Sequence, residues 1–323
     1  MKSPKVSVLI PTYNYARYLP EAIESVLQQE FADFEVLIAD DCSTDHSAAI
    51  IQDFARRDSR IRYQFHSPNM GMVANWNWCL QQARGDYVKY LFGDDRLAGP
   101  QSLGTLVAAL DAAPTATLAA SARYVLDEQS RIVDLWNPLS TGLHRGAAVI
   151  MQCLAQDQNL IGEPTAVMFR RHQGQRGFHP AYRQLVDLEM WFHLLESGDL
   201  VYIAEPLCCF RRHSRQQTVV NERDRVGQYE GLQLLATYAA KPGLSKEALL
   251  RHALFIQVYH ARKARRRDPR RFALAQPLQR QLGWPWYLVY WVRRRLTQPF
   301  KNLRRAIRQR QRVFSCSGSA PAL

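Results

Sequence analysis

The stretch Tyr87-Val-Lys-Tyr-Leu-Phe-Gly-Asp-Asp95 joins a run of strand-forming residues to two adjacent carboxylates. Gly93 stands directly before the acids, where a glycine lets the backbone turn sharply. A strand that ends in this way places its acids at its carboxyl edge, which is where open α/β sheets bind ligands. Two neighbouring carboxylates need a positive partner, and a divalent cation chelated by phosphates is one candidate. Taken alone, the pair is equally consistent with a solvated turn.

This stretch is the fourth of four predicted strands that alternate with helical patterns in the first hundred residues. The first, residues 6–10, is a short continuous apolar run rich in β-branched residues, as expected for a strand buried on both faces. Strands are predicted over residues 6–10, 34–39, 61–65 and 86–92, and helices over residues 19–29, 45–57 and 75–83. Alternation with short connections predicts an α/β fold, a doubly wound and mostly parallel sheet that is Rossmann-like.

Polar residues follow three of these predicted strands. They are Thr12-Tyr13-Asn14, Asp40-Asp41 and Gly93-Asp94-Asp95. Because the carboxyl ends of parallel strands meet at one edge of a sheet, these residues predict a nucleotide site there. The first strand is not followed by G-x-G-x-x-G, and the chain has no G-x-x-x-x-G-K-[ST] motif. A dinucleotide fingerprint and a P-loop are therefore not expected.

The middle of the chain, residues 100–215, has a mixed pattern. Helices are predicted over residues 101–113 and 187–195, and strands over 117–126, 131–135, within 163–170, 200–203 and 207–210. From about residue 224 the pattern becomes helical, over residues 224–238 and 247–266. We therefore expect one domain over residues 1–222 and a helical, basic C-terminal region over residues 223–323.

Charge divides the 323 residues in a similar way. Residues 1–240 hold 22 Lys and Arg against 27 Asp and Glu, whereas residues 241–323 hold 20 against 2. Within the basic part, the aromatic and apolar run 284–292 leads into Arg293-Arg-Arg295 and the basic segment 301–312. Trp and Tyr beside clustered Arg suit an anionic membrane surface. The alternatives are a helix pair docked on the body and nucleic-acid binding, for which no motif is visible.

The compartment is predicted from cysteine usage and from apolar runs. The six cysteines show no C-x-x-C pair, which argues against disulfides and structural zinc and for a reducing compartment. The apolar run near the N-terminus stops at Pro11, too short for a signal-peptide core, and no stretch approaches the roughly 20 apolar residues of a membrane span. We expect a cytoplasmic protein that is peripheral on the cytoplasmic face of the inner membrane.

Five segments, in order, resemble the motifs of family 2 inverting glycosyltransferases, which have the glycosyltransferase A-type fold. They are residues 6–14, 37–45, 69–71, 83–87 and 93–95. Looser matches follow at Val186-Asp187, at Glu205-Pro-Leu207 and at Arg211-Arg-His213. The resemblance covers residues 1–215, and the basic C-terminal part lies outside it.

The resemblance implies a role for each matching residue. It places Pro11, Tyr13 and Asp41 at the nucleobase, Asp94 at the ribose and metal, Asp95 at Mg²⁺ or Mn²⁺, Asp187 at the catalytic base, and His213 near the diphosphate or metal. Inversion needs a base opposite the leaving group, and a cation stabilises the charge that grows on a departing nucleoside diphosphate. An Asp at the start of a helix is expected to stay ionised near the positive helix end.

Alternatives stay open for several of these residues. The family's Glu-Asp pair reads Val186-Asp187 here, so Asp187 could be only a helix cap, and Glu189 is the competing base. His213 could be a structural histidine, and Tyr13 could pack against the sheet. Asn14 is expected to shape the turn rather than to contact a ligand.

The activity implied by the resemblance is transfer of a sugar from a nucleoside-diphosphate sugar to a glycan or lipid-linked acceptor, in cell-surface polysaccharide synthesis. UDP is the expected donor nucleotide, with GDP and TDP open. Two other functions are compatible with the sheet. A sugar-phosphate nucleotidylyltransferase would need a Gly-rich basic loop where Pro11-Thr-Tyr-Asn14 stands. A non-catalytic membrane-associated protein is disfavoured by the acids at positions 41, 94, 95 and 187.

Overall fold

The computed structural model describes residues 3–214, 216–242 and 248–296. The chain divides into two compact units, Met1–Leu234 and Leu235–Leu323. The division falls inside helix α8 (Val226–Ala239), so α7 (Gln217–Arg223) and the start of α8 belong to the first unit.

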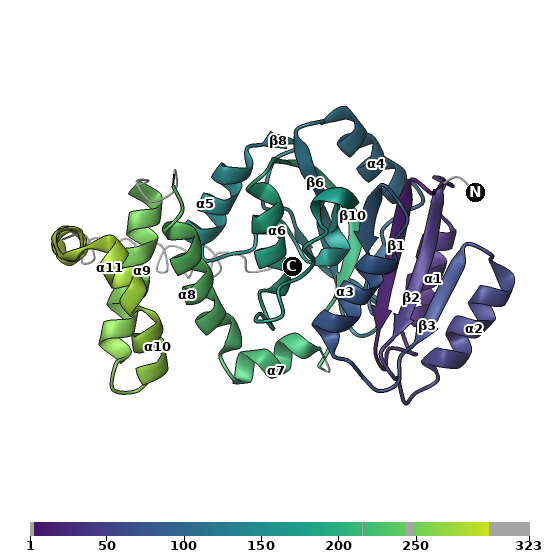
Figure 1. Cartoon of the computed structure of the whole chain (residues 1–323), viewed down its shortest axis with the longest axis horizontal. Coiled ribbons are helices and arrows are strands. Elements are labelled where there is room, and N and C mark those ends of the chain that lie inside the picture. The colour runs from purple at the N-terminus through teal and green to yellow at the C-terminus, as the bar shows by residue number, and fades with distance from the viewer. Residues whose placement is uncertain (1–2, 215, 243–247, 297–323) are drawn as a thin grey trace, which may run out of the picture. The chain divides into compact units, whose positions relative to one another are not determined.

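The first half of the central sheet is parallel, as predicted. Its strands run in the order β3-β2-β1-β4, of which β3, β2 and β1 are labelled in Figure 1. They are β1 (Val6–Thr12), β2 (Phe34–Asp40), β3 (Ile61–Phe65) and β4 (Tyr87–Tyr90). Three helices connect them, namely α1 (Leu19–Leu27), α2 (Ser47–Arg57) and α3 (Met72–Gln82). The registers Val8↔Val36 and Val8↔Lys89 align β1 with both neighbours, so the three strands end at one edge.

Side chains alternate between the faces of these strands. Val6, Val8 and Ile10 of β1 share a fully buried core with apolar residues of α1, α2 and α4 (Ser102–Ala112). Helix α3 lies against β1 and β2 and donates a hydrogen bond from Asn75 Nδ2 to Ala39 O, over 3.0 Å. Coverage by helices explains why β1 and β2 are buried over their whole length, whereas β3, at the edge of the sheet, is partly exposed.

The second half of the sheet is mixed. Strand β9 (Val167–Arg170) lies antiparallel between β4 and β6 (Ala116–Leu126), and β10 (Asp199–Arg211) runs parallel to β6. The remaining strands β5 (Arg96–Leu97), β7 (Ile132–Trp136) and β8 (Gly142–His144) pair antiparallel with β10, β6 and β10. The expected strands 200–203 and 207–210 are one strand, whose register shifts around Pro206 because proline cannot donate a ladder hydrogen bond.

The remaining elements of the first unit surround this half of the sheet. They are α5 (Gly146–Gln156), the short 3₁₀ turns η1 (Pro164–Ala166) and η2 (Arg171–Gln173), and α6 (Val186–Leu195). Helix α6 is buried through residues that include Trp191 and Phe192, so it is an internal helix rather than a surface one. An internal helix holds its side chains in fixed positions, which suits a site built on it.

The second unit is helical. Its elements are α9 (Ala248–Ala264), α10 (Pro269–Leu274), α11 (Gln276–Leu282) and a further helical segment, residues 284–296. Leu254, Phe255, Leu278 and Tyr287 are among its buried residues. Among the helices that the structure describes, none has both the length and the apolar character to cross a membrane.

Candidate active site

The loop after β4 lies close to the end of β1. A Cβ atom at Gly93 would stand 2.7 Å from Thr12 Oγ1 and 3.2 Å from Thr12 Cβ. Only glycine fits this approach without displacing Thr12. The loop therefore presents Asp94 and Asp95 beside the carboxyl end of β1, as the sequence predicts.

Asp95 points into the protein. Its Oδ2 accepts a hydrogen bond from the Thr165 hydroxyl over 2.5 Å, and its Oδ1 accepts one from the Arg211 N–H over 2.8 Å. The side chain is almost fully buried, and burial together with the charge of Asp94 raises the pKa of Asp95 well above its usual range. Asp95 thus joins the end of β4 to η1 and β10, and both of its oxygens are already bonded.

A buried cation lies beneath this loop. Lys89 of β4 is fully buried, and its Nζ donates to the carbonyl oxygen of Thr165 and, over 3.4 Å, to that of Val167. Burial lowers the pKa of Lys89 to about 8, and the charge of Asp95 opposes this shift. The segment 87–95 therefore contributes a buried lysine, Lys89, as well as the two acids Asp94 and Asp95.

Asp94 and His213 are brought together although they lie 119 residues apart in the sequence. Asp94 Oδ2 lies 3.0 Å from His213 Nε2, and both side chains are nearly buried. The imidazole ring packs against Tyr15 and Tyr18, with ring centroids 5.8 Å and 5.5 Å away. Burial and the charges of both aspartates raise the pKa of Tyr15, so its phenol stays protonated. The site thus combines a carboxylate and an imidazole with a phenol hydroxyl nearby.

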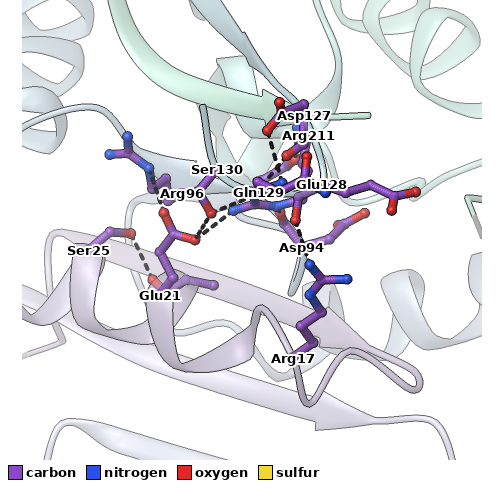
Figure 2. A network of polar contacts seen from close by, with 12 residues as sticks. Arg17, Glu21, Ser25, Asp94, Arg96, Asp127, Glu128, Gln129, Ser130 and Arg211 are labelled. Carbon is purple, nitrogen blue, oxygen red and sulfur yellow. Dashed lines mark hydrogen bonds and ion pairs between the residues drawn. The ribbon is translucent and has the colours of Figure 1, made fainter. Parts of the chain in front are cut away.

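Arg211 holds this arrangement in place. Figure 2 shows its guanidinium among Glu21, Ser130, Asp127 and the loop of Asp94. Its Nη2 lies 2.6 Å from Glu21 Oε2, its Nη1 donates to Ser130 Oγ over 2.8 Å, and its Nε donates to Asp94 O over 2.7 Å. Arg211 is fully buried, and Glu21 also pairs with Arg96.

Sequence reasoning assigned no role to Arg211. The signal available was its place two residues before His213, in a segment that resembles a family motif. A buried guanidinium needs several acceptors, and these come from α1 and from the turn after β6. The arginine therefore connects α1, the turn after β6 and the end of β10 to the Asp94 loop.

The loops after β1 and β2 are connected by Asn14. This residue has a left-handed backbone, φ 58°, and its Oδ1 accepts a hydrogen bond from Thr44 N over 2.8 Å. Its own N–H donates to Ser43 Oγ over 2.8 Å. The expectation that Asn14 shapes the turn agrees with these contacts.

The residues expected at the nucleobase lie around these loops. Pro11 is buried in β1, opposite Ala39 of β2, whereas the Tyr13 side chain is 48% exposed. Asp41 is buried, and its two oxygens accept hydrogen bonds from Met70 N over 2.7 Å and from Gly71 N over 2.9 Å. Asp41 therefore holds the turn at residues 69–71, and Tyr13 is the exposed member of the group.

Asp187 is the second residue of α6. Its Oδ1 accepts a hydrogen bond from Leu188 N over 2.8 Å, and its Oδ2 accepts one from Asn159 Nδ2 over 3.2 Å. Burial raises the pKa of Asp187 to about 7, and the charge of Glu163 adds to this shift. The expectation that the helix end keeps this carboxylate fully ionised is wrong, because the loss of solvent outweighs the helix dipole. A carboxylate with this pKa suits a general base near neutral pH.

Glu189, the competing base, is committed to an ion pair. Arg176 donates two hydrogen bonds to it, Nη1 to Oε1 over 2.8 Å and Nη2 to Oε2 over 2.6 Å. Glu189 is 7% exposed. The guanidinium neutralises the charge of Glu189, whereas the donors to Asp187 are an uncharged backbone N–H and an uncharged amide, which favours Asp187 as the base.

The segment that precedes α6 is held by Glu230 of α8. The backbone N–H groups of Arg183, Gln184 and Leu185 all donate to its carboxylate, over 2.6, 2.9 and 2.8 Å. Asn221 Nδ2 donates to Arg183 O over 3.1 Å. Sequence reasoning missed both residues, because they lie 38 to 47 positions from the segment they hold and no local pattern marks them.

The charge of Glu163 acts on both acidic parts of the site, the loop of Asp95 and the start of α6 with Asp187. Glu163 raises the pKa of both Asp95 and Asp187. Glu163 itself pairs with Arg123 Nε over 2.7 Å. The loop that carries Glu163 is fixed to α6, because Trp191 Nε1 donates to Gly162 O over 2.9 Å. Glu163 therefore lies within electrostatic reach of both the Asp95 loop and the start of α6.

The donor groups at Asp94 and His213 suit one kind of metal site. Over the described parts of the chain, no cluster of three or more His, Cys, Asp or Glu residues could enclose a metal ion. Mg²⁺ is commonly held by one or two carboxylates together with substrate phosphates, so a complete protein cage is not required. Asp94 with His213 fits a cation that arrives with a diphosphate.

The comparisons with known proteins agree with this geometry. Residues 7–173 match the model of the family described as Glycosyl transferase family 2. TuaG of Bacillus subtilis, named as a glycosyltransferase of teichuronic acid biosynthesis, is 29% identical over 199 residues, which cover 62% of this chain and 75% of TuaG.

Two solved structures share the fold. Staphylococcus aureus TarS 1–349 in complex with UDP-GlcNAc has a TM-score of 0.66 at 17% identity, covering 86% of this chain and 82% of that one. Mannosyltransferase PcManGT of Pyrobaculum calidifontis, in complex with GDP-Man and Mn²⁺, has a TM-score of 0.57 at 16% identity, covering 94% and 84%.

Proposed function

Because the chain belongs to glycosyl transferase family 2, we propose that it moves a sugar, with inversion, from a nucleoside-diphosphate sugar to a hydroxyl of a glycan or lipid-linked acceptor. The protein is a glycosyltransferase, and its relatives include a protein of polysaccharide biosynthesis. The observation that carries the proposal is the meeting of Asp94 with His213 at the end of β4, together with the hydrogen-bonded carboxylate of Asp187 at the start of α6.

The donor would bind along the ends of β1, β2 and β4. The exposed ring of Tyr13 can stack on a base, beside Pro11 and Asp41. Each oxygen of Asp41 accepts one backbone hydrogen bond and keeps a second lone pair, which could accept a base N–H. UDP is the first choice of nucleotide because TarS binds UDP-GlcNAc, and GDP stays open because PcManGT binds GDP-Man.

The diphosphate would lie against Asp94 and His213. A bound Mg²⁺ or Mn²⁺ would neutralise charge on the departing nucleoside diphosphate. We assign its protein ligand to Asp94 rather than to Asp95, since the Asp95 carboxylate points into the protein, toward Thr165 and β10, whereas that of Asp94 faces His213. Asp95 would then hold the loop, and His213 would orient Asp94 and approach the diphosphate.

Asp187 would act as the base. Its carboxylate takes the proton of the acceptor hydroxyl while the acceptor oxygen forms its bond to the anomeric carbon. The bond from that carbon to the diphosphate breaks in the same step, and its electron pair leaves with the nucleotide. Asn159 keeps the carboxylate in position, and the partial charge at neutral pH leaves it able to accept the proton.

We propose that the acceptor belongs to a cell-surface polysaccharide and is met at the cytoplasmic face of the membrane. The basic part of the chain, with 20 Lys and Arg against 2 acidic residues in positions 241–323, supports this placement. The basic segment 301–312, which contributes to the sequence-based expectation, lies outside the described residues.

Calorimetric titration with UDP, GDP and TDP, each with and without Mn²⁺, tests the donor assignment. We expect Mn²⁺-dependent binding of one nucleotide, lost in Asp94→Asn and weakened in Tyr13→Ala. Asp95→Asn should lower the unfolding midpoint and retain Mn²⁺-dependent binding in whatever fraction is folded. Binding that survives in Asp94→Asn and disappears in folded Asp95→Asn would reverse the assignment of the two acids.

A further inference from the structure

The helical segment 284–296 has one buried and one exposed side. Tyr287 and Tyr290 are buried against Phe255 of α9, with ring centroids 5.5 Å and 5.6 Å apart. The opposite side carries four exposed apolar residues, which we call the apolar face. They are Leu288, Val289, Val292 and Leu296, exposed by 54%, 54%, 48% and 67%.

The apolar face is continuous. At about 100° per residue, its four side chains fall within a strip roughly 100° wide, centred opposite the two buried tyrosines. All four line one apolar surface depression, together with Arg293. An exposed strip of this width on a helix packed by its other side needs a partner or an apolar medium.

Both flanks of the apolar face carry the same pair of residue types. By the same geometry, Trp284 and Arg295 lie along one flank, and Trp286 and Arg293 lie along the other. Trp284 and Trp286 are 54% and 45% exposed, so their rings are accessible beside the strip.

Arginines of α9 stack on these two rings. The Arg262 guanidinium lies 4.9 Å from the Trp284 ring, and that of Arg251 lies 4.6 Å from the Trp286 ring. An apolar strip bounded on both sides by indoles and guanidinium groups matches the layers of a bilayer surface. Acyl chains would meet the strip, the interface would meet the indoles, and anionic headgroups would meet the arginines.

Charge decides against a second copy of this chain as the occupant. A symmetric contact would bring the arginines on the flanks of one copy against those of the other, and like charges repel. Anionic phospholipids supply the opposite charge along the same lines.

We propose that the apolar face inserts into an anionic phospholipid leaflet, with segment 284–296 lying in the plane of the interface. This inference extends the proposed function, because it names the surface that brings the transferase to its acceptor. It differs from adsorption by a basic tail, which needs charge but no insertion. Insertion requires the apolar residues themselves.

Co-sedimentation of the full-length protein with vesicles tests this, with no sugar donor present. Vesicles of phosphatidylcholine with phosphatidylglycerol are compared with vesicles of phosphatidylcholine alone. We expect binding to the anionic vesicles only, weakened at least roughly tenfold in Leu288→Gln/Val292→Gln, since two apolar side chains no longer leave water. The matched control is Leu249→Gln in α9, an equally exposed leucine at 56% that lies outside the apolar face, and it should bind as the wild type does.

Three outcomes would overturn the inference. The first is equal binding to both kinds of vesicle, and the second is unchanged binding of the double variant. The third is a wild-type protein that binds no vesicles but forms an oligomer, together with a double variant that is a monomer. The last outcome, read by sedimentation velocity, would make the apolar face a contact between copies. Donor titration on the same samples separates the two proposals, because a protein that binds vesicles and no nucleotide would refute only the donor assignment.

Discussion

Replacing Asp187 by Asn should abolish sugar transfer and stabilise the fold at neutral and higher pH. Burial raises the pKa of the wild-type carboxyl to about 7 in the folded protein, against about 3.9 for an ordinary Asp. A folded pKa above the unfolded one means that the contribution of this group to stability is full below about pH 4 and falls as pH rises through 7. At the limit the loss is about 4 kcal/mol, taking 1.36 kcal/mol per pH unit.

Two features of the site reduce that figure. Asp187 keeps an intermediate exposure, so water screens part of the cost of its charge. The carbonyl oxygen of Asn can replace only one of the two acceptor oxygens that now serve Leu188 N and Asn159 Nδ2. We expect Asp187→Asn to gain roughly 2 kcal/mol at about pH 8 and much less at about pH 5.

Urea unfolding at these two pH values measures the gain, and single-turnover transfer measures the activity. Donor titration should be unchanged, because Asp187 lies on α6 and not on the loops expected to hold the nucleotide. The pH profile of the wild-type kcat/KM should rise tenfold per unit below about pH 7 and then level, since the ionised base is the active form. A variant that still transfers sugar, or one that is less stable at high pH, would refute this account of Asp187.

Glu189, the competing candidate for the base, gives the opposite prediction to Asp187. Glu189→Gln removes one charge of the pair with Arg176, whose side chain is 35% exposed, so the fold should lose about 1 kcal/mol or less. Transfer should persist at a measurable rate. Loss of transfer in Glu189→Gln with full activity in Asp187→Asn would exchange the two roles.

Three further predictions follow from other contacts. Glu230→Gln keeps two of the three hydrogen bonds from backbone N–H groups, so it should lower the unfolding midpoint by the equivalent of roughly 1.5–3 kcal/mol and reduce kcat more than donor affinity. The control, Glu222→Gln at an exposed position of α7, should leave stability and activity unchanged. Equal effects of the two variants would contradict the role of Glu230. Arg211→Met leaves acceptors of α1 and of the turn after β6 without their donor, and thermal unfolding should show a loss of roughly 3–5 kcal/mol; an unchanged midpoint would mean that the network is dispensable. Chelation of divalent cations should abolish nucleotide binding, and added Mn²⁺ should restore it, as measured by calorimetry. Nucleotide binding that does not change with the chelator would remove the cation from the mechanism.

The parallel half of the sheet could be predicted because its signals are local. Strands buried on both faces are mostly apolar, and the polar residues that follow β1, β2 and β4 indicate the sheet edge at which these strands end together. The later half escaped in part because β10 carries a proline that interrupts its pattern without ending the strand. Neighbours in the sheet, rather than the sequence of β10, decide that it continues.

Motifs in the sequence indicate the candidate site residues, but the hydrogen bonds and charge states of these residues depend on distant partners. Asp94 and Asp95 are adjacent and chemically identical, and contacts with distant residues distinguish them: His213 for Asp94, and Thr165 and Arg211 for Asp95. The ionisation of Asp187 follows the same rule, because burial by several elements overrides the helix end that the sequence shows. Such effects arise only when segments far apart in the chain meet.

The hydrogen bonds of residues 183–185 to Glu230 set the shortest fragment in which the start of α6, with the proposed base Asp187, keeps its support. A truncation after residue 222, where the composition changes, would excise α8 and leave three backbone N–H groups in front of α6 without their shared acceptor. The same helix runs on past Leu234 into the second unit, so a swap of C-terminal regions between relatives must keep α8 with the catalytic part. The boundary for truncating this enzyme, or for exchanging its C-terminal region, should therefore be placed after α8 and not before it.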